Sequence, residues 1–217
     1  MVSKSKMDGS IGAKNKQKIL AAAEKAFATY GFKGTSVQQI ADEAELPKTN
    51  ILYYFKSKQG LYAALLQDIM SLWNSRFDQV TENDDPAESL ADYINDKMTM
   101  SRTHPQASKI FAMEVLNGAP YLHKYFRSEH VAWTDGRIEI LNHWIKQGKM
   151  KAVDPQYLLF NIWACTQHYA DFSSQITSLR GKAMKRADFD EATRQLIQLV
   201  LSGCGLSVPK KYQESAE

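Results

Sequence analysis

The sequence predicts an all-α protein of about nine helices, with a small N-terminal domain ahead of a larger helical one. Apolar residues recur at helical spacing along most of the chain, and no convincing run of strand-like alternation interrupts them. Proline and glycine fall between these runs, where helices begin and end. A length of 217 residues and a hydrophobic fraction of 44% suit one large globular domain, or a small one joined to a larger one.

The first helix is predicted over residues 14–30, and Gly31 follows it where a helix stop belongs. Its apolar face is formed by residues at helical spacing, namely Ile19, Ala23, Ala26, Phe27 and Tyr30. Residues 1–13 are basic and polar, and are expected to be a disordered tail. The alternative for this tail is a basic arm that reaches the minor groove of DNA.

Two very short helices are predicted next, with paired tyrosines near the end of the second and two lysines after it. Thr35 or Ser36 can cap the first of them. Pro47 separates the two, because proline disfavours helix at the residue before it but suits the opening of the next helix. The second helix, residues 48–55, has only about two turns and must be held by its neighbours. Two short helices joined by a turn and braced by a preceding helix form a helix-turn-helix.

In a helix-turn-helix, the start of the second helix meets base edges in the major groove. Lys48 can donate to guanine, Asn50 can pair with adenine, and the methyl group of Thr49 can contact thymine. Candidates for phosphate contacts are hydroxyl and ammonium groups around the motif: Thr35, Ser36, Tyr53, Tyr54 and Lys58. The alternative is a helical hairpin with packed tyrosines and solvated lysines.

The distribution of charge agrees with an anionic partner for this region. Residues 1–60 contain 10 Lys/Arg and 5 Asp/Glu, whereas residues 61–217 contain 17 and 19. A basic N-terminal quarter on a mildly acidic body favours binding of double-stranded DNA by that quarter. The alternative is a solvated, lysine-rich tail.

The remaining helices make up a second domain, so the predicted boundaries are 14–60 for DNA binding and 61–217 for ligand binding and dimerisation. Ser57 can cap a long helix that runs to about Val80. Its apolar stripe consists of Leu61, Leu65, Ile69, Trp73 and Phe77. Further helices are predicted over residues 86–103, 105–117, roughly 120–149 with a kink, 154–178 and 188–203.

The N-terminal third resembles the TetR family of transcriptional repressors. The resemblance is carried by the segments Gly31-Phe32-Lys33-Gly34-Thr35, Ile40-Ala41, Lys48-Thr49-Asn50, Tyr53-Tyr54-Phe55 and Lys58. It implies a homodimer that represses transcription and releases operator DNA when a small molecule binds. Leu52 stands where many members carry a phosphate-binding tyrosine, so Tyr53 or Tyr54 must supply that contact.

The body has a narrower resemblance, to the subgroup that controls pyrimidine utilisation. It is carried by SRTHPQASKIFAMEVLNGAP and FNIWACTQHYADFSSQI. Members of that subgroup sense uracil and thymine, so the resemblance implies a pyrimidine effector. The alternative effector is a hydrophobic drug or lipid, as other TetR-like proteins use.

Side-chain chemistry independently suits such a ligand. Phe160, Trp163, Gln167 and Ala170 share one face of the helix at 154–178. A carboxamide offers an acceptor beside a donor, which matches the N–H and carbonyl of an imide, and Trp73 and Trp163 could supply flat walls. Gln167 could equally bond across a helix–helix or dimer interface. Further residues expected to line the site are Met98, Phe111 and Met113.

The last two long helices carry apolar residues on more than one face, which predicts burial on several sides. The expected interface residues are Leu158, Ile162, Cys165, Tyr169, Phe172, Leu196, Leu199 and Val200. Pairing with a second copy as a four-helix bundle would bury them, since symmetric operators are read by dimers. A core within a single chain is the alternative.

Other functional classes find little support. No apolar run is long enough for a membrane span, and the N-terminus does not resemble a secretory signal, so a cytoplasmic protein is expected. The sequence contains neither a glycine-rich phosphate loop nor an HExxH motif. Cys165 and His168 lie one helical turn apart, but are expected to be structural. A small helical enzyme is therefore the weaker alternative, and no metal or other cofactor is expected.

Overall fold

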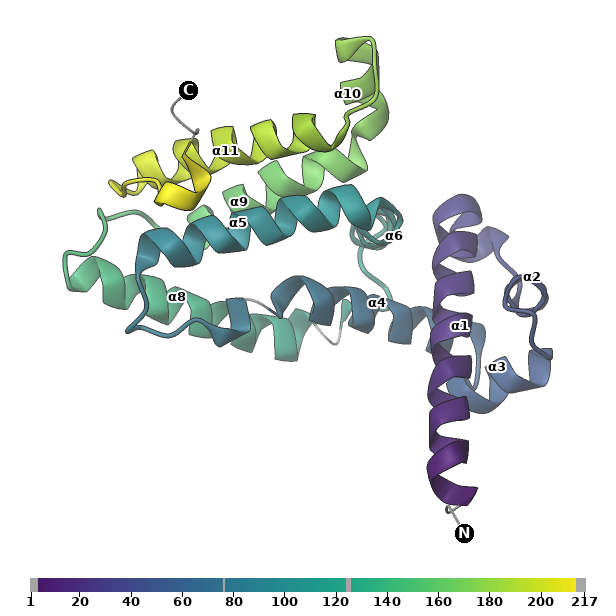
Figure 1. Cartoon of the computed structure of the whole chain (residues 1–217). Coiled ribbons are helices and arrows are strands. Elements are labelled where there is room, and N and C mark those ends of the chain that lie inside the picture. The colour runs from purple at the N-terminus through teal and green to yellow at the C-terminus, as the bar shows by residue number, and fades with distance from the viewer. Residues whose placement is uncertain (1–3, 76, 124–125, 214–217) are drawn as a thin grey trace. The chain divides into compact units, whose positions relative to one another are not determined.

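The computed structural model describes residues 4–75, 77–123 and 126–213, with side chains described from residue 11 onward. Within these ranges the chain forms helices and no strand, so the all-α prediction is confirmed (Figure 1). The chain divides into two compact units. The head unit comprises Met1–Met70 and Lys109–His123, and the body unit comprises Ser71–Ser108 and Lys124–Glu217.

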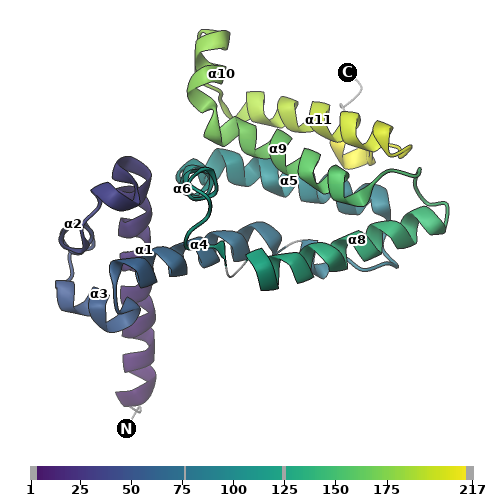
Figure 2. The ribbon, with the colours of Figure 1, turned by 180° about the vertical axis from the view of Figure 1, so that it is seen from behind.

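In the head unit a short helix packs against the long first helix, and a second short helix packs against that short helix (Figure 2). Its elements are α1 (Lys4–Gly34), α2 (Val37–Glu43), α3 (Lys48–Phe55) and most of α4 (Lys58–Asn74). The regular helix of α1 is interrupted at Gly31, whose φ of 67° favours glycine. The buried core of this unit includes Ile19, Ala23, Phe27, Ile40, Ala41, Ile51 and Leu61.

The start of α1 differs from the expectation for the tail. The helix begins at Lys4, so residues 4–13 form its first turns, and residues 1–3 lie outside the described part of the chain. Extending an existing helix adds a hydrogen bond for each residue without a new nucleation step. That gain accounts for helix in a segment whose composition alone suggests disorder.

The end of α4 also differs from its prediction. The helix stops at Asn74 rather than continuing to about Val80, and Phe77 lies in a short 3-10 helix, η1 (Phe77–Gln79). The Arg137 guanidinium lies 2.5 Å from the carbonyl oxygen of Phe77 and 3.1 Å from that of Val80, and donates to both. Because a side chain satisfies these carbonyl groups, the segment does not need helical hydrogen bonds.

In the body unit one helix packs against two others (Figures 1 and 2). α5 (Pro86–Thr103) packs against both α9 (Pro155–Asp171) and α11 (Arg186–Gly203), and α8 (Val131–Lys146) packs against α9. The other elements are the start of α6 (Pro105–Leu116), the π-helix η2 (Phe126–His130), α10 (Ser173–Arg180) and η3 (Lys210–Tyr212). The helix predicted over 154–178 is thus two helices that meet at Phe172.

The head unit includes a segment that lies within the predicted second domain. Residues 109–123 belong to it, and within this segment the buried carboxylate of Glu114 accepts hydrogen bonds from the backbone N–H groups of Tyr121 (2.6 Å) and Leu122 (3.2 Å). The Tyr121 ring centre then lies 4.7 Å from that of Phe32 and 5.4 Å from that of Tyr62. α4 and α6 therefore each contribute residues to both units. No helix in the described residues has the length and apolar character needed to cross a bilayer.

Candidate DNA-binding and ligand-binding sites

The helix-turn-helix begins with a cap on α2. The backbone N–H of Gln39 donates to the Ser36 hydroxyl oxygen (3.1 Å), and the Gln39 carboxamide oxygen accepts from the backbone N–H of Ser36 (2.7 Å). This reciprocal pair is a capping box. Thr35 and Ser36 were both predicted as possible N-cap residues of this helix, and in the structure Ser36 is the N-cap.

α3 is held by its apolar side and presents its polar side. Ile51 and Phe55 are buried, while Lys48 and Thr49 at its first turn are exposed and Asn50 is partly exposed. The connection from α2 is tight, because Glu45 adopts a positive φ of 53°. These side chains at the first turn are therefore free to meet base edges, as the motif requires.

The end of α3 presents an aromatic and basic surface. Tyr53 is 71% exposed, and its ring lies 5.1 Å, centre to centre, from that of the partly buried Tyr54. The ammonium of Lys56 donates to the Tyr53 carbonyl oxygen (2.9 Å) and lies 5.6 Å from the centre of its ring. Lys56 was not among the predicted residues. Its position close to the paired tyrosines is the sequence feature that could have identified it as a candidate for DNA contact.

Two predicted phosphate contacts have other roles in the structure. Thr35 is buried, with its hydroxyl 2.8 Å from the Gly31 carbonyl oxygen and 3.1 Å from that of Ala26. Lys58 donates from its ammonium to the carbonyl oxygens of Phe32 (2.8 Å) and Thr35 (2.8 Å). The hydroxyl of Thr35 is thus removed from the DNA-facing surface, and Lys58 ties α4 to the turn before α2.

Close approach of α3 and α4 depends on a glycine that was also not predicted. A Cβ atom at Gly60 would lie 2.1 Å from the carbonyl oxygen of Phe55. This distance is too short for a non-bonded contact, so only glycine fits at position 60 without a shift of the backbone. Gly60 therefore allows the end of α3 to pack onto the first turn of α4.

The body unit contains an aromatic cluster at the predicted ligand-binding face of α9. The Trp163 indole N–H donates to the Tyr93 hydroxyl (2.8 Å), and the Trp163 ring centre lies 5.6 Å from those of His130 and Phe160. Burial raises the pKa of the Tyr93 hydroxyl, which therefore stays neutral and accepts this bond. Trp73 is also buried in this unit.

The other residues predicted to bind the ligand are divided between the two units. Gln167 is partly buried, and its carboxamide makes no hydrogen bond with the residues that the structure describes. Met98 is a buried core residue of the body unit. Phe111 and Met113 lie in the part of α6 that belongs to the head unit, and Met113 lines a hollow there with Tyr30. That Phe111 and Met113 line a ligand site together with Gln167 stays a prediction.

Lys97, a buried lysine on α5, was not among the residues predicted from the sequence. Its ammonium lies 4.6 Å from the centre of the Trp73 ring, and only 6% of the residue is exposed. Burial lowers its pKa to about 8, while the charge of Asp171 opposes the change. The sequence feature that could have identified it is a lysine on the apolar face of a predicted helix, four residues after Tyr93.

The expected interface residues on α9 and α11 fall into two groups. Ile162 is fully buried in the core of the single chain and is not available to an interface, whereas Leu196 is buried there and also lines the surface hollow between the two helices. Phe172 and Leu199 are 54% and 68% exposed. Cys165 is also exposed, and the other three are partly buried: Leu158, Tyr169 and Val200.

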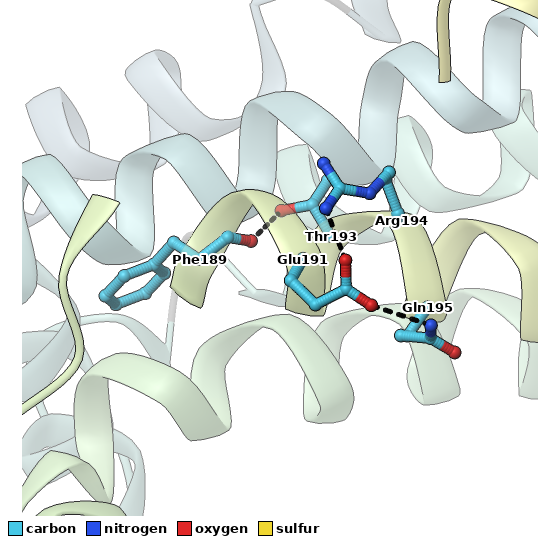
Figure 3. A network of polar contacts seen from close by, with 5 residues as sticks. All are labelled: Phe189, Glu191, Thr193, Arg194 and Gln195. Atoms are coloured by element: carbon cyan, nitrogen blue, oxygen red, sulfur yellow. Dashed lines mark hydrogen bonds and ion pairs between the residues drawn. The ribbon is translucent and has the colours of Figure 1, made fainter. Parts of the chain in front are cut away.

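Between α9 and α11 lies a surface hollow of about 590 Å³ with mainly apolar walls. Its lining consists of Ala164, Cys165, His168, Tyr169, Ala192, Gln195, Leu196 and Leu199. Figure 3 shows how its polar edge is fixed: the Glu191 carboxylate accepts from the Gln195 amide (2.8 Å) and from the Arg194 guanidinium. These two donors hold the pKa of Glu191 below its usual range. Gln195 is thereby held in place beside an apolar surface.

No group of three or more His, Cys, Asp and Glu residues within the described ranges is arranged to hold a metal ion. The described residues form three surfaces: the exposed start of α3, the polar and aromatic cluster around Trp163, and the apolar hollow between α9 and α11.

Comparison with known proteins gives consistent matches. The profile described as bacterial regulatory proteins, tetR family, matches residues 19–65, and that of the YcdC-like protein, C-terminal region, matches residues 66–207. The HTH-type transcriptional regulator RutR of Escherichia coli strain K12 is 39% identical over 196 residues, which cover 90% of this chain and 92% of RutR.

Solved structures share the fold. AibR, in a crystal structure with isovaleryl coenzyme A and operator DNA, has a TM-score of 0.65 at 18% identity, covering 85% of this chain and 97% of AibR. A TetR/AcrR family regulator from Thermobifida fusca has a TM-score of 0.63 at 21% identity, covering 88% of this chain and 98% of that one.

Proposed function

This chain belongs to the tetR family of bacterial regulatory proteins and is a DNA-binding transcriptional regulator, and we propose that a pyrimidine with an imide edge, such as uracil or thymine, releases it from operator DNA. The single observation that carries the ligand class is the unpaired carboxamide of Gln167 beside Trp163 on α9, within the described residues. The resemblance of the surrounding segments to pyrimidine-utilisation regulators supports the same class.

On DNA, the exposed start of α3 reads base edges in the major groove. Lys48, Thr49 and Asn50 make these contacts, and the phosphate contacts come from Ser36, Tyr53 and Tyr54 with Lys56. Ser36 and the free N–H groups at the start of α2 suit a phosphate oxygen. The basic head is consistent with this role.

The protein acts as a homodimer that pairs through α9 and α11. The apolar hollow between these helices and the exposed Phe172 and Leu199 support this arrangement. A two-fold pair places two reading helices on the two half-sites of a symmetric operator. Gln167 lies on α9, which is one of the two helices of this interface.

Ligand binding acts on DNA through the spacing of the two heads. α4 runs without a break from Lys58 in the head unit to Trp73 and Asn74 in the body unit, so a change at its end can move its start. The ligand shifts the equilibrium by its difference in affinity for the two spacings, typically about 1–3 kcal/mol.

Replacing Gln167 with leucine is expected to raise the uracil concentration needed for release by about 10- to 100-fold, because two hydrogen bonds to the imide are lost. Operator affinity without ligand should stay unchanged. Fluorescence anisotropy on the intergenic DNA beside the gene, at fixed salt, measures both quantities.

The matched control is Gln156→Leu, the same substitution at an exposed position of α9. Wild-type protein should respond to uracil and thymine but not to cytosine, which lacks the imide pattern. Release by a hydrophobic dye alone, with no effect of any pyrimidine, would contradict the proposed ligand class and leave the DNA-binding function intact.

A further inference from the structure

A hollow of about 480 Å³ lies within the head unit, where the end of α1, the start of α4 and the end of α6 come together. Its volume is typical of sites that bind small molecules, which range over about 300–1,000 Å³. All of its lining residues belong to the head unit, so it is separate from the aromatic cluster around Trp163. We call this feature the head hollow. Its walls combine aromatic rings with two charged groups, and include Tyr30, Phe32, Lys33, Tyr62, Glu114 and Tyr121.

A buried carboxylate lies in the wall of the head hollow. Glu114 is only 3% exposed, and its carboxylate accepts hydrogen bonds from the backbone N–H groups of Tyr121 (2.6 Å) and Leu122 (3.2 Å). Burial, the charge of Glu114 and a hydrogen bond to its carboxylate raise the pKa of Tyr62, so the Tyr62 hydroxyl stays protonated and acts as a donor. These donors fix the carboxylate in place.

The charge of Glu114 has no counter-ion among the described residues. Its hydrogen-bond donors are neutral groups, and none of the ion pairs formed within the described ranges includes it. Lys33 also lines the head hollow, but it is exposed to solvent. A carboxylate that is buried without a counter-ion is costly. Because a carboxylate can accept about four hydrogen bonds, Glu114 retains capacity for a cationic donor from solution.

Three aromatic rings lie close together in the same wall. The Phe32 ring centre lies 5.0 Å from that of Tyr62 and 4.7 Å from that of Tyr121. Ring faces attract cations within about 6 Å, and the Lys58 ammonium already lies 4.4 Å from the centre of the Phe32 ring. Rings and a carboxylate in one hollow suit an organic cation, because the rings cover its apolar body while the carboxylate accepts from its charged end.

We propose that the head hollow binds primary ammonium ions that carry an aromatic body. The ammonium donates to the Glu114 carboxylate, and the aromatic body packs against the rings of Tyr62 and Tyr121. The negative charge disfavours anions, and a neutral ligand of the same shape lacks the charge-assisted hydrogen bond. This inference does not depend on the pyrimidine effector, and it gives the chain a second class of ligand.

The head hollow adjoins the turn that leads into α2. Phe32 lines it, and the Lys58 ammonium donates to the carbonyl oxygens of Phe32 (2.8 Å) and Thr35 (2.8 Å). Ser36, the next residue, caps α2. A ligand held between Phe32 and Glu114 fastens the end of α6 to this turn. Because a ligand that binds only the folded head stabilises it, hydrogen exchange of the amides in α2 should slow when the amine binds.

Calorimetric titration of the full chain near neutral pH tests the proposal, with 2-phenylethylamine as the probe and 2-phenylethanol as its neutral analogue. The amine is protonated under these conditions. Wild-type protein should bind the amine at least about tenfold more tightly than the alcohol. Glu114→Gln keeps the size of the side chain and an acceptor for the two N–H groups. It should lower amine affinity about tenfold or more and leave alcohol affinity unchanged.

Two further variants separate the charge of the head hollow from its shape. Glu139→Gln, at an exposed position of α8, is the matched control and should bind both probes as wild type does. Tyr121→Leu keeps the backbone N–H that donates to Glu114 but removes one ring, so the affinities for amine and alcohol should both fall about threefold to tenfold. Circular dichroism verifies that each variant is folded.

An amine that binds wild-type protein no more tightly than the alcohol, or does not bind, would overturn the proposal. A folded Glu114→Gln protein with unchanged amine affinity would do the same, because the cation would then bind elsewhere. Amine binding that leaves hydrogen exchange in α2 unchanged would refute the link to the reading motif. Release of operator DNA by uracil is measured separately, so failure of the amine proposal leaves the proposed function standing.

Discussion

Replacing Leu199 with arginine is expected to convert the proposed dimer to a monomer and to lower affinity for a full operator by about 10²- to 10⁴-fold. Leu199 is 68% exposed and lines the hollow between α9 and α11. In the paired state it would be buried, and an arginine there would leave an uncompensated charge in an apolar interface. Two unlinked heads bind the two half-sites independently, so operator binding loses the high effective concentration that a dimer gives its second head.

Analytical ultracentrifugation and anisotropy measure the two consequences on the same protein. Leu179→Arg is the control, because this leucine on α10 is 81% exposed and does not line the hollow. Binding of Leu199→Arg to a single half-site should equal that of wild type, which verifies that the head is intact. A dimeric Leu199→Arg protein with unchanged operator affinity would exclude this face as the interface.

Features of the DNA-binding motif that depend on neighbouring residues were predictable from the sequence. The turn at Pro47, the exposed start of α3 and the capping hydroxyl follow from spacing and residue type within a few positions. The choice of Ser36 over Thr35 was not predictable, because it depends on where α1 ends. The Thr35 hydroxyl finds its acceptors on Gly31 and Ala26 only once α1 has folded beside it.

Features that depend on contacts distant in sequence were predicted poorly. Helical spacing identifies Ile162 and Leu196 as apolar, but it cannot say whether a neighbouring helix or a second copy covers them. α5 covers Ile162 and Leu196 within the single chain, since it packs against both α9 and α11. Lys97 is a second example. Its charge predicts a solvent-exposed position, whereas the structure buries it.

Replacing Lys58 with methionine is expected to loosen the helix-turn-helix by about 1–3 kcal/mol, because two carbonyl acceptors lose their charged donor. The ammonium bonds to Phe32 and Thr35 and lies 4.4 Å from the centre of the Phe32 ring. Hydrogen exchange of the amides in α2 and α3 measures this local stability. Lys56→Met is the matched control, since that exposed ammonium donates to the backbone of Tyr53, three residues earlier in the chain.

The salt dependence of operator binding distinguishes this structural role from a phosphate contact. Each lysine that neutralises a phosphate contributes about 0.9 to the slope of log affinity against log salt concentration. Lys48→Met or Lys56→Met should lower the magnitude of that slope if either lysine contacts phosphate, whereas Lys58→Met should weaken binding without altering it. A Lys58→Met protein with a slope lower by about one and normal exchange in α2 and α3 would instead make Lys58 a phosphate contact. The stability of the reading head would then depend on the capping box at Ser36 and the buried side chains of Ile51 and Phe55 rather than on this lysine.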